Sequence, residues 1–187
     1  MTLLEMKKKV LGLIEELNPN SELLTDDPDI ATKLNEVINS VMFEMARMKK
    51  IPKYVEIEVN KGDLLDFSTI EKECGYEIYQ VSTICGVLYA PKANGTVFKI
   101  MGDGTAEIDC FVYPERITEK TKDKAYEFEL SPDALEVMVY GVAADLLKSD
   151  VSVEYGKIYA ERYETMLARL DSRYQMGVVW VDGGVSL

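Results

Sequence analysis

The spacing of apolar residues divides the chain into three stretches, and the first of them has a helical period. Apolar side chains there recur every three or four positions, which predicts two amphipathic helices. Thr2 and Glu5 form a capping box that starts the first helix, and Pro19 ends it. Asp27 and Pro28 start the second, because aspartate caps a helix N-terminus and proline fits the first turn.

In the second stretch, residues 54–128, the period falls to two, which is typical of half-buried strands. A long apolar run at 76–90 predicts one strand, and the segment 125–130 predicts a last strand that returns to the helices. Asn94 and Gly95 predict a tight hairpin turn, since both central residues of such a turn need a positive φ. This stretch is therefore interpreted as a β-rich module.

The third stretch returns to helix. Ser131 followed by Pro132 starts a helix whose apolar residues cover more than one face, so it should be the most buried helix. A second helix, from about 152 to 174, carries a stripe of tyrosines and leucines. The last 11 residues are apolar and bounded by glycines.

These patterns predict an α+β fold built as a four-helix core with an inserted module. Residues 1–53 and 129–174 form the helical core, and residues 54–128 form the β-rich module between the two helix pairs. Residues 175–187 form an extended C-terminal docking tail.

Charge and composition exclude several classes of function. The 187 residues include 21 lysines and arginines against 33 acidic residues, a net charge of −12, which disfavours a surface that grips nucleic acid or anionic lipid. There is no histidine, the commonest general base and metal ligand. The three cysteines fit neither a zinc motif nor a disulfide framework, so we expect reduced thiols in the cytosol. No window reads as a signal peptide or a membrane span.

Three acidic patterns resemble sites but have simpler interpretations. The turn at Gly102–Gly104 resembles half of a calcium loop, yet the preceding ligand positions are not acidic, and a hairpin turn is favoured. The aspartates at 26–29 are explained as a helix cap, and Glu56 with Glu58 as a solvated strand face. We therefore expect no catalytic residue, no metal and no cofactor.

Tyr155, Tyr159 and Tyr163 lie at spacing four on one helical face. They indicate packing within the core or between subunits, because nucleotide stacking would need more basic residues between them. They are the candidates for a subunit interface.

The apolar tail around Trp180 has two interpretations. It either folds back on its own β-rich module or docks on another subunit as an added strand, with Trp180 as the anchor. We favour docking, because such a segment has little local support.

Three segments carry a resemblance to a known family: LSPDALEVMVYGVAADLLKSD, YGKIYAERYETMLARLDSRY and VVWVDGG. Together they resemble the head–tail adaptor (connector) proteins of tailed bacteriophages and prophages, and the β-rich insert is similar to the tail-tubular members. The early helix DDPDIATKLNEVINSVMFEMARM is similar to the first long helix of that family.

The resemblance implies a non-enzymatic virion protein at the neck, made in the bacterial cytoplasm. About a dozen copies would form a ring closed by head-to-tail contacts beneath the portal protein. The ring would extend the DNA channel towards a downstream tail or neck protein, and DNA would pass without specific binding. The resemblance also implies that the C-terminal tail inserts into the portal, which here means Val178, Val179, Trp180 and Val181.

Two other classes of function stay open. One is a tail-completion or tail-terminator protein, which would bind the tail rather than the portal. The other is a non-viral cytosolic module that binds another protein.

Overall fold

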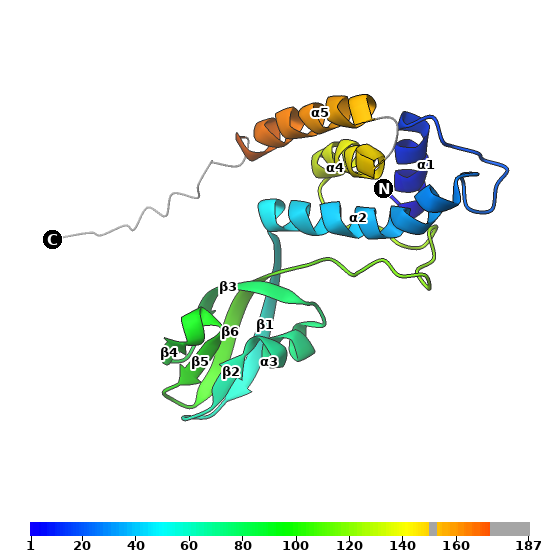
Figure 1. Ribbon diagram of the computed structural model, residues 1–187. Coiled ribbons are helices and arrows are strands. Elements are labelled where there is room, and N and C mark those ends of the chain that lie inside the picture. Colours follow the sequence, from blue (N-terminus) through cyan, green and yellow to red (C-terminus); the bar gives the residue numbers. More distant parts are fainter. Residues whose placement is uncertain (150–152, 173–187) are drawn as a thin grey trace.

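The computed structural model describes residues 1–149 and 153–172 (Figure 1). The helices are α1 (Leu3–Leu13), α2 (Pro28–Lys49), α3 (Phe67–Cys74), α4 (Pro132–Leu146) and α5 (Val153–Ser172). The strands are β1 (Ile51–Val59), β2 (Leu64–Asp66), β3 (Ile78–Cys85), β4 (Tyr89–Lys92), β5 (Val97–Ile100) and β6 (Gly104–Val112). Short 3₁₀ turns lie at Ala93–Gly95 and Leu147–Ser149.

The caps expected for the first two helices are present. The Thr2 hydroxyl accepts a hydrogen bond from the Glu5 backbone N–H, and the Glu5 carboxylate accepts one from the Thr2 N–H. The Asp27 carboxylate caps α2 by accepting hydrogen bonds from the backbone N–H groups of Asp29 and Ile30. The apolar stripe predicted α1 to continue to Pro19, but the helix ends at Leu13, because Glu15 adopts a φ of 62° and turns the chain away.

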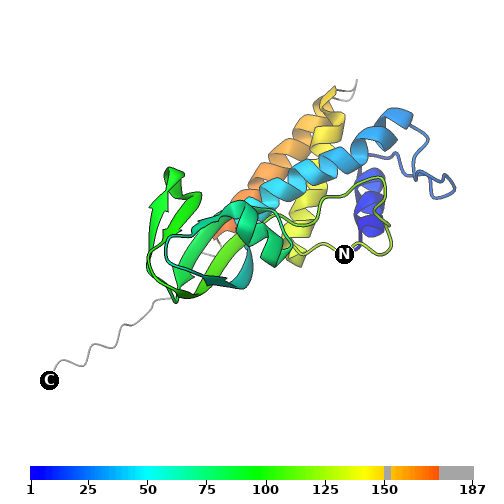
Figure 2. The same ribbon diagram turned by 90° about the horizontal axis from the view of Figure 1, so that it is seen from below.

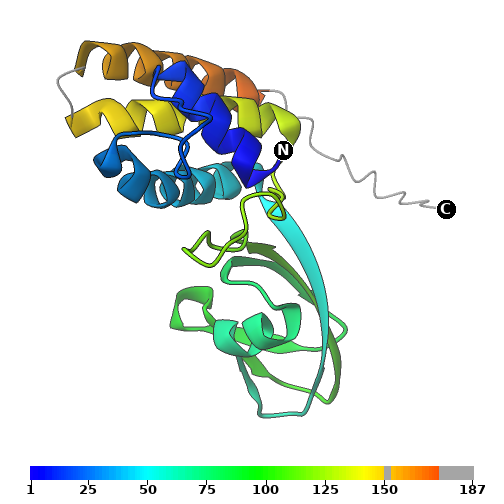
Figure 3. The ribbon, with the colours of Figure 1, turned by 90° about the vertical axis from the view of Figure 1, so that its right-hand side faces the viewer.

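Helix α4 is the centre of the helical layer, as its apolar residues predicted. Ten of its 15 residues are buried, and α1, α2 and α5 each pack against it. Figures 1 and 3 show α5, α4 and α2 stacked side by side, and α1 packs against α4. The burial of α4 on several sides fixes the order of the other helices around it.

The strands form two separate antiparallel sheets, with the orders β1-β6-β3 and β2-β5-β4. Residues alternate between buried and exposed along β1 and β6, so the first sheet has an inner apolar face. Helix α3 packs against β1, β2 and β3, and its Ile70 is fully buried. Seen from below, the two sheets lie to one side of the helical layer (Figure 2).

The predicted fold class, a four-helix core with an inserted β-rich module, is wrong. The described residues contain five helices and two small three-stranded sheets, and α3 lies within the stretch that was predicted as all β. The other helices do not form a four-helix core, because the main helix-to-helix contacts all involve α4. The 11 residues between β2 and β3 were enough to form α3, which the period-two pattern concealed.

Three connections decide how the sheets are built. The hairpin predicted at Asn94 is confirmed: it joins β4 to β5, and Asn94 has a φ of 56°. The turn at Gly102–Gly104 is not a hairpin, because it joins β5 to β6 in the other sheet. The segment 125–130 is not a strand either, since its only bridge joins Glu127 to Thr2.

Two general expectations can be checked in the part of the chain that the structure describes. No described helix is long and apolar enough to cross a membrane. Cys74, Cys85 and Cys110 are free thiols, and burial raises the pKa of Cys110 to about 11.

Candidate interaction surfaces

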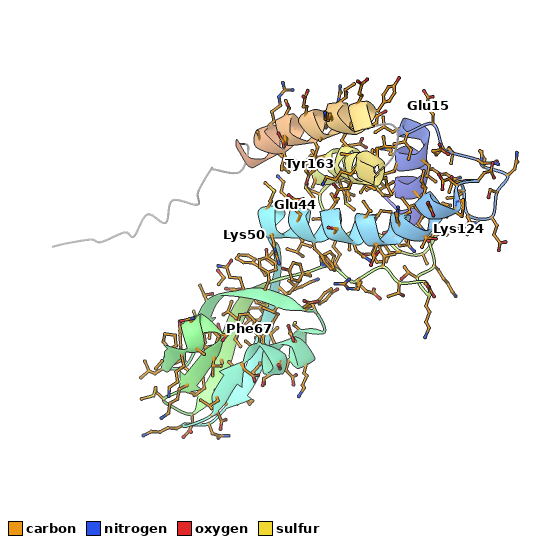
Figure 4. The ribbon with its side chains drawn as sticks, viewed as in Figure 1. Glu15, Glu44, Lys50, Phe67, Lys124 and Tyr163 are labelled. Carbon is orange, nitrogen blue, oxygen red and sulfur yellow. The ribbon has the colours of Figure 1, made fainter. Side chains whose placement is uncertain are left out.

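Two of the three tyrosines proposed for a subunit interface contact other helices of the same chain. The Tyr159 hydroxyl donates a hydrogen bond to the Leu13 carbonyl (2.8 Å), and the Tyr163 hydroxyl donates one to the Glu44 carboxylate (3.0 Å; Figure 4). Tyr155, in contrast, is 63% exposed. A role between subunits stays a prediction for all three, and Tyr155 is the most accessible of them.

A glycine allows Tyr163 to approach α4. A Cβ atom at Gly141 would lie 2.8 Å from the Tyr163 ring and 2.9 Å from Val41 of α2. Burial is the main cause that raises the pKa of Tyr163, and the neighbouring Glu44 carboxylate adds to it. A groove of about 510 Å³ opens beside this contact, between α2, α4 and α5.

The predicted portal-docking residues Val178, Val179, Trp180 and Val181 lie outside the described residues. The choice between docking and folding back therefore stays a prediction.

The outer face of the first sheet is acidic. Glu56 and Glu58 of β1, with Glu107 and Asp109 of β6, are exposed on it, and no lysine or arginine occupies the outward positions of these two strands. Glu56 stands directly opposite Glu107 in the strand register, an arrangement that destabilises a sheet. The Tyr54 hydroxyl donates a hydrogen bond to Glu56 (2.8 Å), and this bond raises the Tyr54 pKa to about 12. We call these four carboxylates the acidic face.

A second feature lies where α2 meets the sheets. A cavity of about 640 Å³ is lined by Phe43, Arg47, Met48, Tyr113 and Arg116, among others, and we call it the arginine–aromatic cavity. The Phe43 and Tyr113 rings lie 5.0 Å apart. The Arg116 guanidinium sits 4.8 Å from the centre of the Phe43 ring, and that of Arg47 sits 5.3 Å from the centre of the Tyr113 ring. The site combines an aromatic floor with positive charge. It therefore suits a partner segment that carries both apolar and acidic side chains.

The acidic patterns weighed as metal sites have structural roles. The Asp103 carboxylate accepts a hydrogen bond from the Lys61 backbone N–H (2.6 Å), which ties two loops together. Asp27 caps α2 by accepting bonds from the N–H groups of Asp29 and Ile30. In residues 1–149 and 153–172, no three acidic or cysteine side chains are placed to hold a metal ion together.

Comparison with known proteins does not assign the chain to a family. No protein-family model matches the sequence, and no curated protein matches it.

Sequence reasoning missed the arginine–aromatic cavity. Its residues come from α2, from the segment before β3 and from the segment after β6, which are far apart in the sequence. No local sequence motif predicts such a site. Helical spacing does not single out Arg47 either, because Glu44 lies three positions before it, where an ion pair along the helix would be expected.

Proposed function

We propose that the chain is the subunit of a ring-shaped adaptor between the portal and the tail of a tailed phage or prophage. In this proposal the ring extends the channel through which DNA leaves the head. The subunit binds the portal on one side and a tail or neck protein on the other, and it carries out no chemistry.

The observation that best supports this function is the acidic face. Each phosphate that a protein neutralises holds DNA in place through the release of counterions. A channel wall with Glu56, Glu58, Glu107 and Asp109 makes no such contacts, so DNA slides past it. The opposed pair Glu56 and Glu107 costs stability in the free subunit, which is understandable if the charge itself is useful.

The first test is assembly on a portal. The chain is co-expressed with the portal protein of the same genome, and the complex is weighed by native mass spectrometry. A discrete complex with about a dozen copies of the chain supports the proposal, because closed rings have defined copy numbers. A well-formed portal that binds no copy contradicts it, and binding to the tail tube protein instead would favour a tail-completion protein.

A second test asks whether the acidic face lines the channel. In the double variant Glu56→Lys, Glu107→Lys, the portal complex should retain duplex DNA in a gel at low salt, whereas the wild-type complex should not. The control variant Glu73→Lys, Glu119→Lys makes the same change in charge at two exposed positions elsewhere. Equal retention by both variants would show that the acidic face does not line the channel.

A further inference from the structure

The two arginines of the arginine–aromatic cavity lack carboxylate partners in the part of the chain that the structure describes. No acidic side chain of the described residues lies within ion-pair distance of the guanidinium of Arg47 or Arg116. Arg47 donates a hydrogen bond to the Tyr113 hydroxyl, and Arg116 covers the Phe43 ring. In a chain with a net charge of −12, two cations held on aromatic rings without an acidic partner suggest that a partner arrives from outside.

The cavity also contains two acidic residues, which limit what it can bind. Glu44 accepts the hydrogen bond from Tyr163 on the α5 side, so its carboxylate is already engaged. Glu77 lies at the cavity without such a bond among the described residues. A polyanion such as DNA would meet these carboxylates along its length, whereas a single acidic loop can reach the arginines alone.

Such a loop lies at the opposite end of α2. The backbone N–H of Asn18 donates to the Leu24 carbonyl (2.7 Å), and its side-chain amide donates to Asp26 (2.7 Å), which close residues 18–26 into an Ω-loop. Leu24 has a φ of 65°, a strained conformation that the loop maintains. Figures 1 and 2 show the loop projecting beyond the helical layer, away from the sheets.

The tip of this loop is both apolar and acidic. Leu23 is 62% exposed, although Thr25, two residues later, is almost fully buried. Glu22 and Asp26 flank it, and residues 18–29 contain no cation. We call residues 18–26 the acidic loop.

We infer that the acidic loop of one copy docks in the arginine–aromatic cavity of the next copy. Leu23 packs on the aromatic floor near Met48, and Glu22 pairs with Arg47 or Arg116. The loop cannot reach the cavity of its own chain, because Phe43 and Met48 lie about 23–30 Å along α2 from its first residue, Pro28.

This contact is head-to-tail, since the two surfaces are different and lie at opposite ends of one helix. Contacts of this kind continue from copy to copy and close into a ring when the rotation allows it. The inference deepens the proposed function, on which it rests: it names the surfaces through which the subunits of the ring meet.

Cysteine cross-linking tests the contact directly. The double variant Leu23→Cys, Met48→Cys is made in a Cys85→Ser background, because Cys85 is the exposed native thiol. Mild oxidation of the concentrated chain, alone and on the portal, should give a ladder of disulfide-linked multimers on a non-reducing gel. A link within one chain is excluded by the length of α2, because a disulfide needs Cα atoms within about 7 Å.

The matched control is Leu88→Cys, Met48→Cys, which moves the first cysteine to a leucine that is 77% exposed on a loop of the sheets. A ladder no stronger than that of this control, both alone and on the portal, would overturn the inference. A portal complex without a ladder leaves the proposed function standing and removes the inference. A ladder without a portal complex supports the inferred contact between copies and contradicts the proposed function.

A charge exchange then checks which residues pair. Arg47→Glu, Arg116→Glu in the ladder-forming chain should reduce cross-linking at least about tenfold, as expected for loss of a central contact. Adding Glu22→Lys should restore part of it, because the charges are then reversed on both sides. If the arginine variant blocks assembly on the portal while the ladder is unchanged, the cavity binds a different protein and the inference is wrong.

Discussion

Asn39 ties the helical layer to the chain that returns from the sheets, and its replacement should be costly. Its side-chain amide donates to the Ile117 carbonyl, and its side-chain oxygen accepts from the Ile117 N–H, both at 2.8 Å. Asn39 is 5% exposed and Ile117 is 3% exposed, so water cannot replace either bond without opening the structure. We predict that Asn39→Ala destabilises the fold strongly.

The size of the loss in stability follows from the two backbone groups of Ile117 that would lose their hydrogen-bond partners. A buried donor or acceptor without a partner costs about 1–3 kcal/mol, so the N–H and C=O of Ile117 together cost about 2–6 kcal/mol. Replacement of asparagine by alanine improves helix propensity by about 0.7 kcal/mol, which offsets only a small part. The net loss of about 2–5 kcal/mol is a large fraction of the stability of an ordinary domain, about 5–15 kcal/mol.

Asn35, one turn earlier on α2, provides the matched control. Its side-chain oxygen is buried without a hydrogen-bond partner among the described residues. Asn35→Ala removes an unsatisfied polar atom rather than a bonded one, so the free energy of unfolding should change by less than about 1 kcal/mol. Both variants are compared by urea unfolding, followed by helical circular dichroism, with the slope checked for constancy. Free energies of unfolding that agree within about 0.5 kcal/mol would refute the role assigned to Asn39.

Three further predictions follow from other parts of the fold. Gly141→Ala should lower the free energy of unfolding by about 1–2 kcal/mol, because the added Cβ would overlap Tyr163. Gly12→Ala should raise it by up to about 1 kcal/mol, because a Cβ there would meet no atom closer than 3.9 Å. Chemical denaturation measures both free energies. In thiol titration at pH 8, Cys85 should react at once and Cys110 only on unfolding. Because the pKa of Cys110 is raised from 9.0 to about 11, its contribution to stability should be complete below pH 9 and be lost as the pH rises to about 11. Glu107→Gln should raise the free energy of unfolding by about 0.2–1 kcal/mol at low salt, and an equal gain at 1 M salt would contradict electrostatic repulsion as its cause.

The helices were predictable where local chemistry decides them. Thr2, Asp27 and Pro132 mark the starts of α1, α2 and α4, and each start is where its residues predicted it. Caps and N-terminal prolines act within one turn, so no tertiary information is needed. The end of α1 was not predictable in the same way, because the left-handed turn at Glu15 serves the acidic loop that follows rather than the helix itself.

The sheets show the limit of periodic patterns. Alternation along β1 and β6 identified strands with one buried face, but it carries no information on which strands pair. The turn at Gly102–Gly104 therefore looked like a hairpin although it crosses between two sheets. The same limit hid the arginine–aromatic cavity, because Arg47 and Arg116 meet only after the strands have returned the chain to α2.

Features that cost the free subunit stability are concentrated on its surfaces. The opposed carboxylates of Glu56 and Glu107 repel each other, and Leu23 is exposed at the tip of a strained loop. Within residues 1–149 and 153–172, Arg47 and Arg116 form no ion pair. The buried Asn39 side chain, in contrast, has both of its polar atoms hydrogen-bonded to Ile117.

Natural sequences break local rules mainly where function requires it. The negative charge of the acidic face would keep DNA from binding, and the exposed Leu23 and the two arginines would bind a second copy. If these costs are the consequence of assembly, combining Glu107→Gln with Leu23→Ser should give a free subunit at least as stable as the wild type and defective in forming complexes with the portal. Normal assembly of that double variant would show that the exposed Leu23 is not used between copies, and its exposure would then need another cause.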